Sequence, residues 1–201
     1  LGDVYKRQDE VRTFCMNPNG EVVQENYSGI ATVNGHSYAN YKTPNTNFAL
    51  LVSEKFTEPF KEPIQYGQHI ARLANMLGGG ILVQRFGDLL EGRRSTPERI
   101  ASSVITPTLT CATPGDLSLV IPYRQMTSII EMLQALDKIA PGTASRYTLL
   151  YGIEVKFYSA RVKLTQQLET EGVKNLFTIG DGAGVTRGLL QASASGVYVA
   201  R

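Results

Sequence analysis

Hydrophobic and polar residues alternate in short runs over the first part of the chain, and turn residues separate the runs. Alternation with a period of two is typical of β-strands that bury one face. A dense turn signal, Asn17-Pro18-Asn19-Gly20, follows the first run, and Asn34-Gly35 is expected to end the third. The pattern predicts a β meander or small barrel rather than a βαβ unit, with strands over Val11–Met16, Glu21–Gln24, Gly29–Val33 and Phe48–Phe56.

Two later segments place apolar residues every three to four positions, which is the spacing of a helix with one buried face. Pro63 begins the first helix, and the run Gly78-Gly79-Gly80 ends it, because glycine suits the left-handed residue that follows a helix. Pro122 begins the second helix, and Pro141-Gly142 ends it. The predicted buried faces consist of Ile64, Ile70, Leu73, Ala74 and Leu77 in the first helix, and of Met126, Ile129, Ile130, Leu133 and Leu136 in the second.

The segments between and after these helices are shorter or less regular. Ile81–Arg85 is a short predicted strand, and Thr148–Tyr158 is a longer one in which Ile153, Val155 and Phe157 face one way. The other predictions are a charged loop over Gly87–Pro97, irregular chain over Ser102–Cys111 and a polar connector over Gln166–Lys174.

The stretch Asn175–Leu190, NLFTIGDGAGVTRGLL, has the strongest chemical signal in the sequence. An apolar run containing Leu176 and Ile179 predicts a strand that ends in Gly180-Asp181, and the helical pattern of Arg187–Ala200 follows a glycine-rich turn. Bare glycines let a ligand approach the backbone, and a helix N-terminus offers unpaired N–H groups to an anion. An aspartate accepts hydrogen bonds from sugar-type hydroxyls. The combination predicts a nucleotide-cofactor site over Gly180, Asp181, Gly182, Ala183, Gly184, Val185 and Thr186.

Several cofactor motifs compete for this turn. A Walker phosphate loop is excluded, because no Gly-Lys-Ser/Thr follows. A Rossmann finger would need a third glycine where Val185 stands, and an acid about 20 residues further on, beyond the last residue. The second flavin motif of two-dinucleotide-fold flavoproteins, an apolar strand closing in Gly-Asp, fits better. A Gly-Asp turn without a ligand stays open as an alternative.

Composition and charge narrow the class of protein. The chain has 201 residues, of which 42% are apolar, and a net charge of +2, so neither nucleic acid nor another strongly charged partner is expected. No run approaches the length of a membrane span. Cys15 and Cys111 show no metal-binding spacing, and no metal site is expected. Two cysteines without a disulfide framework favour a reducing cytoplasm.

Both ends of the sequence suggest a piece of a longer protein. Residues 1–8, LGDVYKRQ, have the character of translated adapter sequence from a metagenomic fragment and are left out of the fold prediction. The pattern of Gln191–Arg201 is still helical at the last residue, without a glycine or proline stop.

Each of the isolated reactive residues has a structural interpretation beside the functional one. Cys15, next to the first turn, could relay electrons or protons, but a small buried hydrophobe is the favoured interpretation, as it is for Cys111. His36 is favoured as a solvated loop residue over a proton donor, and His69 as a surface or structural residue of the first helix.

Two further sets of charged or polar residues are candidates for substrate binding. Arg93-Arg94 could bind a phosphate or an acidic substrate, although a solvated charged loop is favoured. Tyr158 and Arg161 close the last predicted strand before the cofactor segment, where a substrate pocket could open. Cys15, Tyr158 and Arg161 are therefore weak catalytic candidates.

The motifs together resemble one known family. FCMNPNGEVV, VNGHSY, TNFALLVS and TIGDGAGVTRGLLQASASG are similar to the C-terminal half of the NAD(FAD)-utilizing dehydrogenase family, over roughly residues 9–201. Members of this bacterial group of FAD-dependent oxidoreductases carry an N-terminal G-x-G-x-x-G finger, which this chain lacks. Relatives often have a second cysteine and a glycine where this chain has Asn17 and Asn19, which argues against a redox-active cysteine pair.

The resemblance implies a fold and a function. It implies an α/β chain, with α+β character, in which a β-rich substrate domain (residues 9–164) is inserted into a Rossmann-like FAD-binding domain that resumes at residues 165–201. Asp181 would bind the ribityl chain of FAD, and the N–H groups of Gly184, Val185 and Thr186 would face the flavin ring. The expected activity is hydride or electron transfer between a small organic substrate and FAD, with NAD(P) as a second candidate cofactor. The alternatives are another class of flavoenzyme, such as an RNA-modifying one, or a non-catalytic nucleotide-binding domain.

Overall fold

A computed structural model of the chain describes residues 10–54, 56–156, 161–186 and 188–201. The chain forms two compact units, Leu1–Val155 and Lys156–Arg201, which are described separately below. The predicted adapter segment, residues 1–8, and Tyr158 lie outside the described residues. The domain boundary expected near Leu164 stays a prediction about the longer protein.

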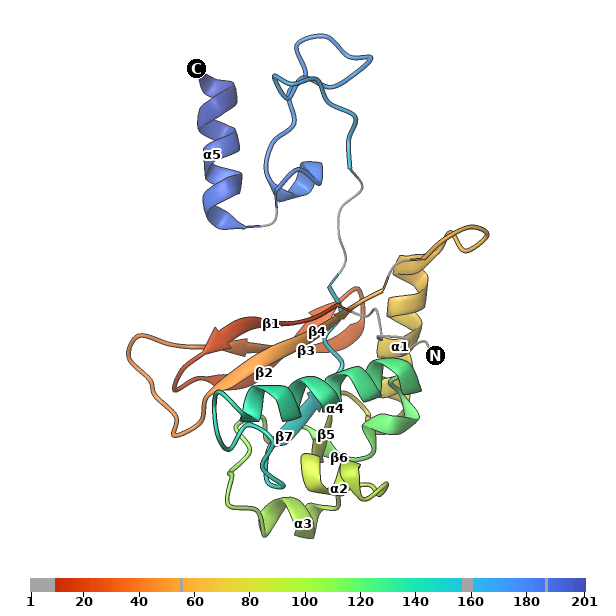
Figure 1. The fold of residues 1–201 in the computed structure, drawn as a ribbon, viewed down its shortest axis with the longest axis vertical. Coiled ribbons are helices and arrows are strands. Elements are labelled where there is room, and N and C mark those ends of the chain that lie inside the picture. The colour runs from red at the N-terminus through yellow and green to blue at the C-terminus, as the bar shows by residue number, and fades with distance from the viewer. Residues whose placement is uncertain (1–9, 55, 157–160, 187) are drawn as a thin grey trace, which may run out of the picture. The chain divides into compact units, whose positions relative to one another are not determined.

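Four strands form the first part of unit 1, as predicted, but they pair as two separate two-stranded sheets and not as the expected meander or small barrel (Figure 1). They are β1 (Glu10–Asn17), β2 (Glu21–Tyr27), β3 (Ile30–His36) and β4 (Asn47–Ser53). β1 pairs antiparallel with β4, and β2 pairs antiparallel with β3. The prediction that Asn34-Gly35 ends the third strand is wrong, because Asn34 pairs with Val23 and Gly35 with Val22 inside the ladder. β4 begins one residue earlier than predicted and ends at Ser53 instead of reaching residue 56.

A third sheet, of three strands, lies at the centre of unit 1. Its middle strand, β5 (Leu82–Arg85), pairs parallel with β6 (Thr113–Pro114) and antiparallel with β7 (Leu149–Gly152). β7 is shorter than the strand predicted over residues 148–158. The reason is that β5 has only four residues, and its ladder with β7 ends where Leu82 meets Gly152.

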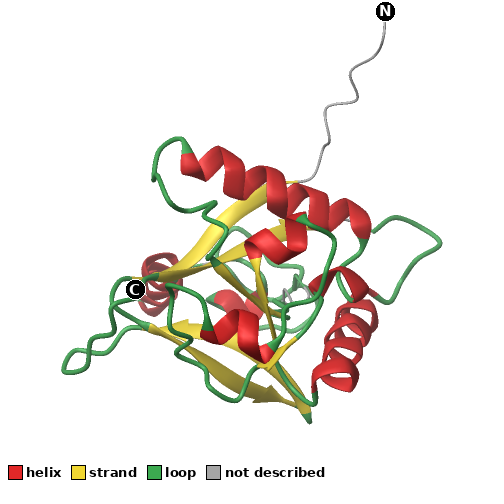
Figure 2. Cartoon of the chain, turned by 90° about the horizontal axis from the view of Figure 1, so that it is seen from below, coloured by secondary structure: helices red, strands yellow, loops and turns green. Residues whose placement is uncertain are grey.

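Helices cover these strands (Figure 2). α1 (Pro63–Gly78) and α4 (Tyr123–Asp137) form where the apolar periodicity predicts them, and Gly79 ends α1 in the left-handed conformation (φ 66°). The charged loop predicted over residues 87–97 is wrong in part, because α2 (Phe86–Leu90) occupies its first half and α3 (Pro97–Ala101) begins at its end. A short 3-10 helix, η1 (Leu117–Leu119), precedes α4.

The core of unit 1 joins both long helices to the central sheet. Burying a large aliphatic or aromatic side chain stabilises the fold by about 1.5–3 kcal/mol, so this cluster is the main source of its stability. Its buried members are Ala74, Leu82, Phe86, Leu89, Leu117, Val120, Met126, Leu133 and Ile153.

Within its described residues, unit 2 contains η2 (Asp181–Ala183) and α5 (Leu189–Ala200). The predicted strand over residues 176–179 does not form within the described residues, where Phe177 makes only an isolated bridge with Glu169. Leu176, Phe177 and Ile179 remain 46%, 43% and 44% exposed, although their apolar character fits a buried strand. At that bridge the Thr170 N–H donates to the Leu176 carbonyl oxygen at 2.7 Å, and the Thr178 N–H donates to the Leu168 carbonyl oxygen at 3.1 Å. Pairing does not continue beyond the bridge in the described residues, so no strand is formed.

Candidate functional site

The predicted cofactor turn is a tight turn closed by two left-handed glycines. Gly180 (φ 72°) precedes η2 and Gly184 (φ 69°) follows it. The Gly184 N–H donates to the Asp181 carbonyl oxygen at 3.0 Å, which closes the turn. Both glycines occupy a region that is strained for other residues, so the turn depends on them.

Small residues of α5 lie against this turn. The Gly180 N–H donates to Ser195 Oγ at 3.0 Å, and the Ser195 hydroxyl donates to the Ala192 carbonyl oxygen at 2.7 Å. A Cβ built at Gly196 would lie 3.6 Å from Ile179 Cδ1, and one built at Gly180 would lie 3.7 Å from Ala192 Cβ. Close packing of α5 on the turn is thus a sufficient reason for the small residues at positions 192 and 196.

Asp181 presents its carboxylate to solvent at the tip of the turn. The Thr186 hydroxyl donates to Asp181 Oδ1 at 2.6 Å and orients the carboxylate. A Cβ built at Gly182 would meet nothing within 4 Å, so the space beside the acid is open. An exposed, oriented acceptor beside a bare backbone fits the hydroxyl groups of a ribityl chain.

The backbone N–H groups that follow the turn agree less well with their predicted role at the flavin ring. α5 begins at Leu189, two residues later than the predicted Arg187, so Gly184, Val185 and Thr186 precede the helix. The Gly184 N–H is engaged by Asp181, as described above. The assignment of Val185 and Thr186 to a flavin ring stays a prediction.

Cys15 lies on a β-bulge of β1 and is exposed, so its interpretation as a buried hydrophobe is wrong. Its φ of 46° is left-handed, and Cys15 and Met16 together face one residue of β4 between the pairs Phe14–Ala49 and Asn17–Asn47. Asn17 Nδ2 donates to the Cys15 carbonyl oxygen at 2.6 Å and to Asn47 Oδ1 at 3.0 Å. Bulges re-aim side chains, and this one turns the thiol outward.

The other isolated candidates are exposed wherever the structure describes them. Cys111 is exposed, which also contradicts the buried interpretation, because its neighbours Leu109 and Ala112 are the residues that pack on the core. His36 and His69 are exposed, as predicted, but His36 is the last residue of β3 and not part of a loop. Arg161 is exposed in unit 2, and Tyr158 lies outside the described residues. The grouping of Cys15, Tyr158 and Arg161 as catalytic residues stays a prediction.

A buried acid on α2 is a feature that the sequence analysis missed. Asp88 is 1% exposed and accepts hydrogen bonds from Ser95 Oγ, Arg93 Nε and Arg99 Nη1. Burial raises the pKa of Asp88, but the hydrogen bonds from Ser95 and Arg93 and the charges of Arg85 and Arg99 outweigh burial and hold that pKa below its usual value. The sequence did contain a signal for a buried helix at this position, because the apolar residues Phe86 and Leu89 lie on either side of Asp88 at helical spacing.

The described residues contain neither a candidate metal cluster nor a candidate membrane-spanning helix. They contain no group of three or more His, Cys, Asp or Glu side chains placed to bind a metal ion. None of their helices has the length and apolar character that crossing a bilayer requires.

The fold and the turn define a class, an α/β protein with an exposed Gly-Asp turn ahead of its last helix. The chain belongs to the family described as FAD-dependent protein, C-terminal domain-like, whose model matches residues 3–157. It is also similar to an uncharacterized protein of Clostridium beijerinckii (strain ATCC 51743 / NCIMB 8052), with 32% identity over 202 residues. That match covers 94% of this chain and 37% of the relative, so the chain spans little more than a third of the relative's length.

Proposed function

We propose that this chain is part of an FAD-dependent oxidoreductase of the NAD(FAD)-utilizing dehydrogenase type. In this proposal residues 9–164 form a substrate domain, and residues 165–201 return to the FAD-binding domain. FAD, when bound, supplies the hydride and electron chemistry, and a nicotinamide dinucleotide is a possible electron partner. The membership of the chain in an FAD-dependent family supports the choice of cofactor.

The observation that carries the proposal is the oriented, exposed carboxylate of Asp181. Thr186 fixes one of its oxygens by a 2.6 Å hydrogen bond, and the bare Gly182 leaves room beside it. In the proposal Asp181 accepts hydrogen bonds from the ribityl hydroxyls, and Thr186 holds the carboxylate in place. The family match ends at residue 157, so the assignment of Asp181 rests on the geometry of the turn and on its Gly-Asp motif.

Flavin content tests this assignment in the longer protein that contains the chain. Removal of a charged acceptor should weaken FAD binding by about tenfold to a hundredfold, because hydrogen bonds to charged groups contribute about 1.5–3 kcal/mol. Asp181→Ala should therefore purify with less flavin per mole of protein, measured by visible absorbance. Glu171→Ala, which removes another exposed carboxylate of unit 2, is the matched control. Equal flavin content in Asp181→Ala and wild type would refute the assignment.

A further inference from the structure

Five charged side chains at the α2–α3 end of unit 1 form one chain of alternating ion pairs, Arg99–Asp88–Arg93–Glu91–Arg146. Asp88 Oδ1 lies 3.1 Å from Arg99 Nη1 and 2.9 Å from Arg93 Nε. Glu91 Oε2 lies 2.6 Å from Arg93 Nη2, and Glu91 Oε1 pairs with Arg146 Nη2. The chain of charges begins and ends with an arginine, so three guanidinium groups face two carboxylates.

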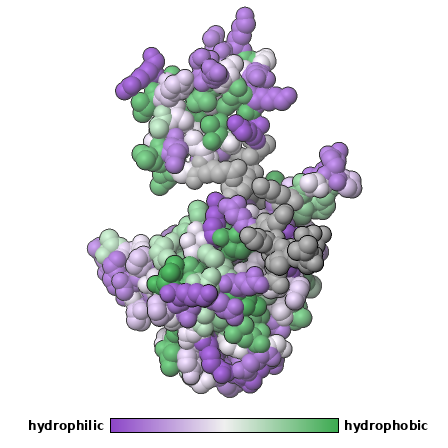
Figure 3. Space-filling model, in the orientation of Figure 1, coloured by the Kyte–Doolittle hydropathy of each residue, from purple (hydrophilic) through white to green (hydrophobic). Residues whose placement is uncertain are grey.

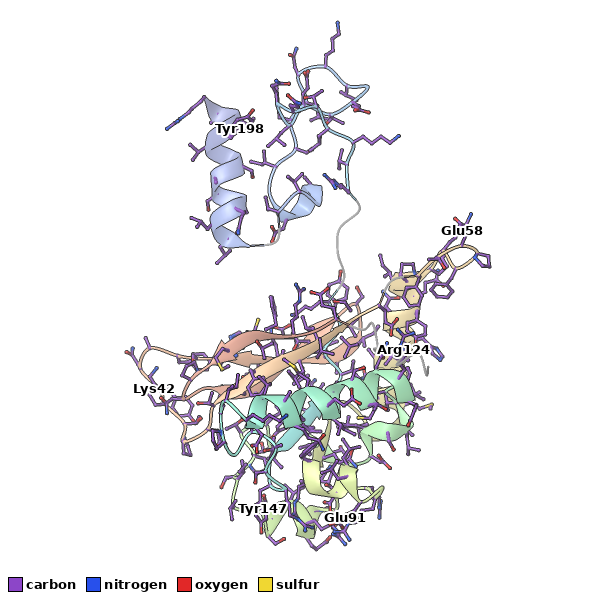
Figure 4. The ribbon with its side chains drawn as sticks, viewed as in Figure 1. Lys42, Glu58, Glu91, Arg124, Tyr147 and Tyr198 are labelled. Atoms are coloured by element: carbon purple, nitrogen blue, oxygen red, sulfur yellow. The ribbon has the colours of Figure 1, made fainter. Side chains whose placement is uncertain are left out.

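Arg85 adds a fourth guanidinium group to this surface. Arg85 Nη1 donates to the Arg99 carbonyl oxygen at 3.2 Å, and its guanidinium carbon lies 5.2 Å from the ring centre of Tyr147. Arg85 Nε is buried and has no hydrogen-bond partner among the described residues. Figure 4 shows Glu91 and Tyr147 at the same end of unit 1. We call Arg85, Arg93, Arg99 and Arg146 the arginine surface.

Three of the four guanidinium groups of the arginine surface face solvent, whereas one of the two carboxylates that pair with them is buried. The side chains of Arg93, Arg99 and Arg146 are 42%, 37% and 64% exposed, whereas that of Asp88 is 1% exposed. Hydrophilic side chains cover this lower end of unit 1 in Figure 3. Glu91, at 38%, is the acid that remains partly exposed.

Two other acids nearby are engaged elsewhere. Asp116 Oδ1 accepts from the Ser118 N–H at 2.9 Å and from the Ser118 hydroxyl at 2.7 Å, which caps η1. Hydrogen bonds from its own backbone N–H and from Thr96, together with the charge of Arg94, hold the pKa of Glu98 below its usual value, so Glu98 stays ionised beside Arg94. Neither acid forms an ion pair with the arginine surface among the described residues.

Stability alone does not account for this number of cations. A buried carboxylate needs a compensating charge and hydrogen bonds, and Arg93 with Ser95 already supplies both to Asp88. The carboxylates also fix the orientation of the guanidinium groups, which lowers the entropy lost when a ligand binds. A planar guanidinium fork matches the oxygens of a phosphate group better than an ammonium group does.

We propose that the arginine surface binds a phosphate group of a small molecule. Arg99 and Arg146 each use one nitrogen in the ion pairs of the described residues, so their remaining N–H groups are available to the phosphate oxygens. The site lies in unit 1 and does not depend on the flavin proposal. At Arg93 it takes up the phosphate alternative that the sequence left open beside the favoured interpretation of a solvated loop.

Calorimetric titration of the 201-residue chain with inorganic pyrophosphate at low salt tests the proposal. Arg146→Gln should weaken binding by about threefold to tenfold, because one charged hydrogen-bond donor is lost and no buried acid is stranded. Arg72→Gln, an exposed arginine on α1, is the matched control and should bind as wild type does. Equal weakening in both variants, or a wild-type dissociation constant above about 1 mM, would overturn the proposal.

Two further measurements separate the remaining explanations. Side-chain nitrogen resonances of Arg93 and Arg99 should shift with pyrophosphate in wild type, which also serves if Arg146→Gln folds poorly. Unchanged resonances would contradict the site.

A short single-stranded oligonucleotide is the second probe. Much tighter binding of the oligonucleotide than of pyrophosphate, with a steep salt dependence, would overturn the small-molecule assignment in favour of a nucleic-acid backbone.

Discussion

Asn75 of α1 binds both backbone polar groups of Ala31 in β3. Asn75 Oδ1 accepts from the Ala31 N–H at 2.8 Å, and Asn75 Nδ2 donates to the Ala31 carbonyl oxygen at 2.9 Å. The same Nδ2 lies 3.2 Å from the Gly80 carbonyl oxygen. The side-chain amide thus makes the pair of backbone hydrogen bonds that a neighbouring strand would make with β3. These bonds join α1 to the strands of unit 1.

Replacing Asn75 should therefore destabilise unit 1. Asn75→Ala leaves backbone groups of the buried Ala31 without their partner, and each such loss costs about 1–3 kcal/mol. We expect a loss of about 2–4 kcal/mol in the free energy of unfolding, measured by urea denaturation. Met76→Ala on the same helix, at a residue 73% exposed, is the control and should change stability by less than about 0.5 kcal/mol. Equal stability of the two variants would contradict the role of Asn75.

Gly35 lies too close to β4 to carry a side chain. A Cβ built there would overlap the Asn47 carboxamide and lie 2.5 Å from Asn17 Nδ2. Asn17 is the residue that also binds the Cys15 carbonyl oxygen. The bare backbone at position 35 therefore sets the position of the bulge that presents Cys15.

Gly35→Ala should destabilise the protein by about 1–3 kcal/mol, because the added methyl group must push Asn47 aside. Asn47→Ala removes the obstructing carboxamide, so the double variant should lose less stability than the sum of the two single changes. Denaturant unfolding of the four proteins measures this coupling. Gly80→Ala is the matched glycine control, since its Cβ would meet only Gln24 Oε1, at 3.5 Å. Strict additivity would show that the predicted overlap does not occur.

Local signals were enough to predict the two long helices. Proline at position 63 and glycine at position 79 mark the ends of α1, and the apolar period predicts α4 from residue 122 onward. Both signals act within a few residues and do not depend on the rest of the chain. The glycine-rich turn after Gly180-Asp181 was also predicted, because glycines that adopt left-handed conformations are a local feature.

Features that depend on distant partners could not be predicted in the same way. β3 runs through Asn34-Gly35 because β2 pairs with both residues, which overrides their turn preference. The apolar segment at residues 176–179 has strand character but no neighbouring strand in the described part of unit 2. The buried Asp88 joins residues from α2, α3 and the loop between them, so its partners cannot be read from one local pattern.

Because of Tyr151 in β7, the free energy of unfolding should fall as the pH rises in the alkaline range. Burial raises the pKa of Tyr151 to about 12, from 10.0. The unfolded chain loses the phenol proton first, so the stabilising effect is complete below about pH 10 and is lost as the pH rises through 12. Tyr151→Phe should show a shallower fall in unfolding free energy across this range than wild type. Parallel curves for the two proteins would argue against a buried phenol.

The lowered pKa of Asp88 gives the opposite dependence, at acid pH. Its folded-state pKa lies below the ordinary value of 3.8, so the unfolded state takes up the proton first. The contribution of Asp88 to stability is therefore complete above that value and is lost as the pH falls through the folded pKa. Asp88→Asn should cost about 1–3 kcal/mol at neutral pH and give a shallower fall in stability below about pH 4. Glu58→Gln, whose side chain is 77% exposed, is the control and should follow the wild-type curve. Urea unfolding of wild type and the two variants across this pH range measures these curves. An Asp88→Asn curve parallel to that of wild type would mean that the arginines do not hold Asp88 ionised.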